Sequence, residues 1–72
     1  MNIMAAVLFK DGVERQYAVG EYAGRQEAEA ALATMMETFT ATMNEEDVRY
    51  IALGSTMILL EQVVAINFGL ND

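Results

Sequence analysis

Residues 50–68 read YIALGSTMILLEQVVAINF and carry a single formal charge, the carboxylate of Glu61. A helix that spans a membrane needs roughly 20 continuous apolar residues, but Glu61 ends this run after eleven uncharged positions. Gly54-Ser55 interrupts it earlier and has the glycine-first pattern of a type II′ hairpin turn. The stretch therefore predicts a hairpin followed by a further strand, and not a membrane segment.

The register of this hairpin follows from its turn. With Gly54-Ser55 at the tip, strands 48–53 and 56–60 pair so that alternate apolar residues share one face. Residues 63–68 are predicted to form a fifth strand after a bend in the chain. Its pairing partner stays open at this point, and the first strand is one option.

A second hairpin is predicted at the start of the chain, where residues 3–9 and 13–19 flank a turn. A two-residue loop would scatter the apolar side chains over both faces. A three-residue loop at 10–12, with Gly12 in the left-handed conformation, brings them together. The face collected in this way contains Ile3, Ala5, Val7, Phe9, Val13, Tyr17 and Val19.

Residues 25–43 have the periodicity of an amphipathic helix. Gly24 is the expected N-cap, and Asn44 is the expected left-handed residue that ends the helix. The predicted apolar stripe consists of Ala28, Leu32, Met35, Met36, Phe39 and Met43. The whole chain, 1–72, is then one α+β domain of order ββαββ(β). Its four- to five-stranded, mainly antiparallel sheet should carry one amphipathic helix on one face.

The composition limits what the chain can do. Eleven carboxylates stand against four basic residues, for a net charge of −7, and both Cys and His are absent. Direct binding to nucleic acid or to an anionic membrane needs clustered Lys and Arg, and the four basic residues here are scattered along the chain. We therefore expect neither nucleic acid nor a membrane as a direct partner. Disulfides are excluded, and the commonest ligands of structural zinc are missing. A chain this short has a small core, so oligomerisation is the remaining route to extra stability.

Residues that could perform catalysis are scarce. The one serine, Ser55, lies in a predicted tight turn, and no thiol or imidazole is present to act as nucleophile or base. Glu45, Glu46 and Asp47 are consecutive, so their side chains point in different directions and do not converge on a cation. We therefore predict no enzymatic activity, no catalytic residue, no metal, no cofactor and no small-molecule substrate.

The predicted helix covers only one face of the sheet, and the other face remains apolar. If the two hairpins are neighbours, these residues form one patch of the kind that usually marks an interface. The predicted interface consists of Met4, Ala6, Leu8, Tyr50, Ala52, Met57 and Leu59. We therefore expect a non-enzymatic protein-interaction domain that forms a homodimer or binds another protein. The alternative is a curled sheet that covers both faces within one monomer.

A second function is compatible with the acidic charge. Small acidic proteins, some of them encoded by phages, imitate the phosphates of DNA and block basic nucleic-acid-handling proteins. The acidic surface for this alternative would consist of Glu27, Glu29, Glu37, Glu45, Glu46 and Asp47.

A secretory signal requires basic residues before its apolar run, and no basic residue precedes the apolar run 3–9. A cytoplasmic protein of bacterial or phage-like type is expected.

Overall fold

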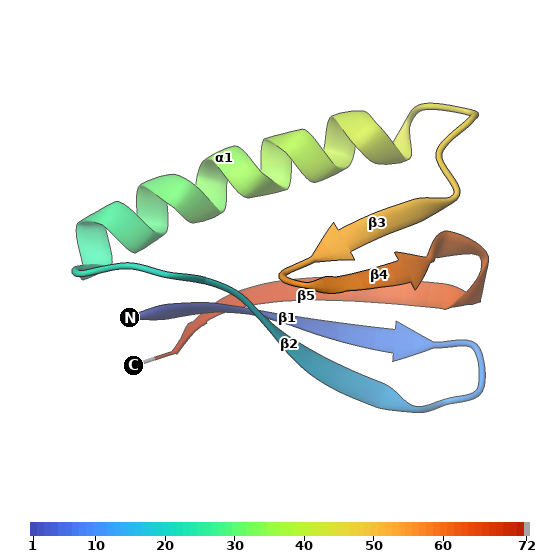
Figure 1. Ribbon diagram of the computed structural model, residues 1–72, viewed down its shortest axis with the longest axis horizontal. Coiled ribbons are helices and arrows are strands. Elements are labelled where there is room, and N and C mark those ends of the chain that lie inside the picture. The colour runs from blue at the N-terminus through green and yellow to red at the C-terminus, as the bar shows by residue number, and fades with distance from the viewer. Residues whose placement is uncertain (72) are drawn as a thin grey trace.

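The structure is a computed structural model that describes residues 1–71. It contains five strands, one α-helix and one short 3₁₀ turn (Figure 1). In chain order these are β1 (Asn2–Phe9), β2 (Glu14–Glu21), α1 (Arg25–Met43), β3 (Tyr50–Leu53), β4 (Thr56–Leu59), η1 (Leu60–Gln62) and β5 (Val63–Asn71). The chain is therefore an α+β protein with antiparallel strands, as predicted.

The strands form two sheets, so the prediction of one sheet of four to five strands is wrong. One sheet has the order β2-β1-β5, and the other is the hairpin β3-β4. Strand β1 pairs with β2 on one side and with β5 on the other, so it has no free edge for the hairpin. The hairpin packs on a face of the larger sheet instead, because this buries its apolar side against Ala5 and Val7 of β1.

The helix and the hairpin β3-β4 lie on the same side of the three-stranded sheet (Figure 1). Ala5 and Val7 of β1 and Ile51, Leu53 and Ile58 of the hairpin form one buried cluster. We call the side of the sheet that contacts this cluster its core-facing side, and the opposite side its outer face. The molecule thus has two layers: the sheet, and above it the helix with the hairpin.

The N-terminal hairpin has the predicted register. Ala5 pairs with Tyr17 and Val7 with Arg15, and the Phe9 N–H donates to the Val13 carbonyl at 2.9 Å. Gly12 has a φ of 86°, as a three-residue loop with a left-handed glycine requires. The turn residue and the apolar alternation therefore predicted the pairing from Met4 to Phe9, whereas a bulge between Ile3 and Met4 shifts the register at the far end of the hairpin.

The hairpin β3-β4 also has the predicted register, with Ile51 opposite Ile58 and Leu53 opposite Thr56. Gly54 has a φ of 62°, and no residue other than glycine has a positive φ in the described part of the chain. A positive φ at the first turn position alone fits the predicted type II′ turn. The two strands are shorter than expected, because the ladder begins at Tyr50.

Strand β5 pairs antiparallel with β1, which resolves the partner that the sequence left open. Ala5 lies opposite Phe68 and Val7 opposite Ile66. The register shifts between Leu8 and Phe9, so the regular part of β5 begins after Val64. At nine residues, β5 is longer than the predicted strand 63–68.

Helix α1 has the predicted bounds and begins at the expected N-cap, Gly24. Its inner side contains the buried Ala28, and the Phe39 ring lies 5.2 Å from that of Phe68 on β5. The predicted stripe is too wide, because Met36 and Met43 are about half exposed, at 51% and 49%.

The end of the helix differs from the prediction. Asn44 has a φ of −84° and is right-handed, so the expected left-handed stop is wrong. The Glu45 N–H donates to the Thr42 carbonyl at 3.1 Å, which closes the last turn without a positive φ. A tight turn of this kind satisfies a terminal carbonyl as a left-handed residue would.

The core is small for the chain. Its buried apolar residues are Ile3, Ala5, Val7, Ala28, Ile51, Leu53 and Ile58. The accessible surface is 5001 Å², whereas a compact monomer of 7.9 kDa has about 4,400 Å². The radius of gyration is 12.4 Å, against about 11 Å for a compact chain of this length. The molecule is more open than its mass requires.

Candidate functional site

The predicted interface residues lie on two separate surfaces. Met4, Ala6 and Leu8 alternate with the buried residues of β1, so they lie on the outer face of the three-stranded sheet. All three are half-buried. Their neighbours across the sheet include Gln16 and Asn67, which both pair with Ala6. This face is therefore a mixture of apolar and polar side chains.

The other predicted interface residues lie on the hairpin β3-β4. Tyr50 and Met57 are 55% and 64% exposed, Ala52 is exposed and Leu59 is half-buried. Because the sheet and the hairpin pack through their core-facing sides, their remaining faces point away from each other. The single patch expected from the sequence is therefore not formed.

The acidic residues are spread along exposed parts of the chain. Glu27, Glu29 and Glu37 lie on α1, and residues 45–47 lie in the loop that follows it. Arg25 Nε donates to Glu29 Oε1 at 3.0 Å, which is the one ion pair within the described residues. Such an exposed pair contributes little to stability, roughly 0.3–0.5 kcal/mol. The remaining carboxylates of this set are solvated.

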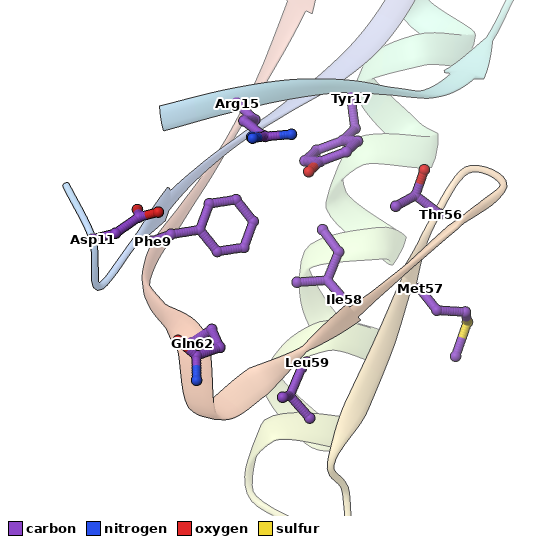
Figure 2. Close-up of a pocket in the computed structure, with 9 residues that line it drawn as sticks. All are labelled: Phe9, Asp11, Arg15, Tyr17, Thr56, Met57, Ile58, Leu59 and Gln62. Atoms are coloured by element: carbon purple, nitrogen blue, oxygen red, sulfur yellow. The ribbon is translucent and has the colours of Figure 1, made fainter. Parts of the chain in front are cut away.

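A groove of about 340 Å³ separates the N-terminal hairpin from β4. Figure 2 shows Phe9 from β1 and Ile58 from β4 facing into it, with Arg15 and Tyr17 above them on β2. The residues that line it are Phe9, Asp11, Arg15, Tyr17, Thr56, Met57, Ile58, Leu59 and Gln62. The groove is therefore apolar at its floor and polar at its rim.

Two polar residues of the groove, Asp11 and Arg15, have structural roles. Asp11 Oδ1 accepts a hydrogen bond from the Val13 N–H at 2.9 Å and so holds the turn. Arg15 lies opposite Val7 on the core-facing side of β2, where it is exposed. A charge pointing inward on an edge strand discourages pairing with another chain. The signal is present in the sequence, because Arg15 is the one charged residue on an otherwise apolar face of the predicted hairpin.

The two edges of the three-stranded sheet differ in protection. Strand β2 contains Glu14, Arg15 and Glu21 and a register irregularity opposite the Ile3–Met4 step. Strand β5 has the sequence VVAINFGLN, without a charge or a proline. Charges, prolines and bulges are the usual means by which proteins block an open strand edge. The β5 edge has one bulge near its beginning and is otherwise open.

Neither the comparisons with known proteins nor a search for membrane-spanning helices assigns a function to the chain. Comparisons with protein-family models, with curated proteins and with solved structures found no match. Within residues 1–71, no helix combines the length and apolarity needed to cross a lipid bilayer.

Proposed function

We propose that this chain is a small protein-interaction domain that acts as a homodimer and catalyses no reaction. One observation carries the proposal: the molecule exposes roughly 600 Å² more surface than a compact monomer of its mass. This excess is close to the roughly 800 Å² that each partner buries in a typical stable interface. A second copy would cover surface that the folded chain leaves open.

The small core supports self-association in particular. Seven residues form the buried apolar core, and all three Phe side chains, Phe9, Phe39 and Phe68, are only half-buried. Domains of this size usually gain stability from a disulfide, a metal or oligomerisation. With no cysteine or histidine in the chain, oligomerisation is the route that this composition favours.

The net charge of −7 gives the proposal a distinctive dependence on salt. Two like-charged copies repel each other, and salt screens this repulsion over about 10 Å at 0.1 M. Homodimerisation should therefore strengthen as salt is added. An acidic inhibitor of a basic protein would behave in the opposite way, because salt weakens attraction between opposite charges.

Sedimentation equilibrium tests the proposal directly. At low micromolar to millimolar concentrations, we expect the mass to rise from 7.9 kDa toward twice that value, and to rise further with added NaCl. A mass of one chain at every concentration and salt level would contradict the proposed homodimer.

A further inference from the structure

We infer that two copies of the chain associate by antiparallel pairing of their β5 strands across a two-fold axis, which joins the two three-stranded sheets into one. This inference rests on the proposed homodimer and specifies how it forms. The pairing uses the regular part of β5, residues 65–71. The partner is thus a second copy, and the contact is an edge and not a face.

The first argument is the state of the two edges. β5 is the outermost strand of its sheet in the described part of the chain, so alternate N–H and C=O groups point outward without a strand partner. It carries no charge or proline over nine residues. β2, at the other edge, carries charges at both ends and a bulge. A sheet with one protected and one open edge favours pairing at the open one.

The second argument is the burial along β5. Ile3, Ala5 and Val7 on β1 are 0% exposed. Their direct partners on β5, Leu70, Phe68 and Ile66, all point to the same core-facing side but are only half-buried. The difference arises because β1 has a neighbour on each side and β5 has one. A further strand beside β5 would cover these three side chains.

The third argument is the register that the two-fold axis produces. Pairing residues 65–71 over their full length places Phe68 opposite the same residue of the second copy. On the core-facing side, Ile66 then lies opposite Leu70, and on the outer face Asn67 lies opposite Gly69. Apolar pairs on one face, small or polar pairs on the other, and no charge anywhere make this register favourable.

The helices are compatible with this arrangement. The Phe39–Phe68 contact places α1 above β5, so the two helices would lie on the same side of the joined sheet, close to the axis. The exposed surface of α1 includes small, uncharged side chains, which allow helices to approach closely. These are Ala30, Thr34, Thr38, Thr40 and Ala41, and Glu37 lies among them.

Two isosteric substitutions test the pairing. Ala6 pairs with Asn67 on β5 and with Gln16 on β2, so these two residues occupy equivalent exposed positions at opposite edges of the same face. Asn67→Asp places a carboxylate from each copy about 7–8 Å apart across the axis, and should weaken dimerisation at least about fivefold at low salt. Gln16→Glu adds the same charge at the far edge and should change dimerisation less than about twofold.

The other outcomes of this experiment are equally decisive. Equal weakening by both variants would indicate packing through the outer face, and weakening by Gln16→Glu alone would indicate pairing through β2. Either result overturns the β5 inference and leaves the homodimer standing. A wild-type chain that stays monomeric overturns both.

Hydrogen exchange of the unmodified chain gives a second test that does not depend on any variant. Raising the protein concentration across the dimerisation range should slow exchange at alternate amides of residues 65–71. Amides on the free edge of β2 should exchange at the same rate throughout. Concentration-independent exchange along β5 in a sample that sedimentation shows to be dimeric would refute edge pairing.

Discussion

Gly54 lies at the tip of the hairpin β3-β4, where the hairpin meets strand β2. A Cβ built at this position would lie 2.5 Å from the carbonyl oxygen of Ala18 on β2, and its φ is 62°. Real Cβ atoms do not approach a backbone oxygen so closely, and a side chain also disfavours this φ. The glycine therefore serves both the turn of the hairpin and the contact of its tip with the sheet.

The residue-scale prediction compares Gly54→Ala with Gly12→Ala. Gly12 also has a positive φ, 86°, but a Cβ there would meet nothing within 4 Å. Gly12→Ala should lower the free energy of unfolding by about 1–2 kcal/mol, the cost of a left-handed residue. Gly54→Ala should lower it by at least about 1 kcal/mol more, because the tip must move away from β2. Urea denaturation at one fixed protein concentration measures both, and equal losses would show that the contact with Ala18 is unimportant.

At the scale of the element, the hairpin β3-β4 has one side in the core and one in solvent. Ile58 is 4% exposed, whereas its neighbour Met57 is 64% exposed. The alternation follows from the strand geometry, which directs successive side chains to opposite faces. The core-facing side packs the hairpin on the sheet, and the other side is exposed.

The element-scale prediction uses these neighbours as a matched pair. Ile58→Ala should lower the free energy of unfolding by about 2–4 kcal/mol, because it empties part of a small core. Met57→Ala should change it by no more than about 0.5 kcal/mol, as for an exposed site. Thermal and urea denaturation provide the measurement. A loss of dimerisation in Met57→Ala would instead assign the hairpin's free face to the dimer interface.

For the whole molecule, association and folding should be coupled. A homodimer that covers half-buried side chains is more stable at higher concentration, because mass action favours the assembled form. A tenfold increase in protein concentration should raise the unfolding free energy per dimer by about 1.4 kcal/mol, and the melting temperature by about 4 °C. Calorimetry or circular dichroism at several concentrations tests this. A melting temperature independent of concentration would contradict a stabilising dimer.

The sequence was sufficient to predict the features that depend on a few neighbouring residues, namely the two hairpin turns. Gly12 and Gly54 determine their turns, and each turn fixes the register of a hairpin. The placement of the second hairpin is different, because the alternation around Ile51 and Ile58 suits either pairing at a sheet edge or packing on a sheet face. The structure has packing on the face, where Ile51 and Ile58 are buried with Ala5 and Val7 of β1.

The candidate site depended on that same choice. The residues expected to form one patch alternate correctly on their strands, and Met4 and Met57 both lie on faces directed away from the core. Their strands lie in different layers, so the two faces are on opposite sides of the molecule. The edge of β5 was visible in the sequence as an uncharged run, but only the strand order shows that it is an edge.

The central position of β1 has a consequence for the order in which the chain can fold. β1 and β2 are joined by a short turn and can pair as soon as both exist, whereas β5 begins only at Val63. Contacts between distant parts of a chain form slowly, because a long loop must first close. During synthesis, one side of the backbone of the uncharged β1 therefore stays unpaired until β5 has been made. In that interval the nascent chain is at its most vulnerable to pairing with the wrong strand.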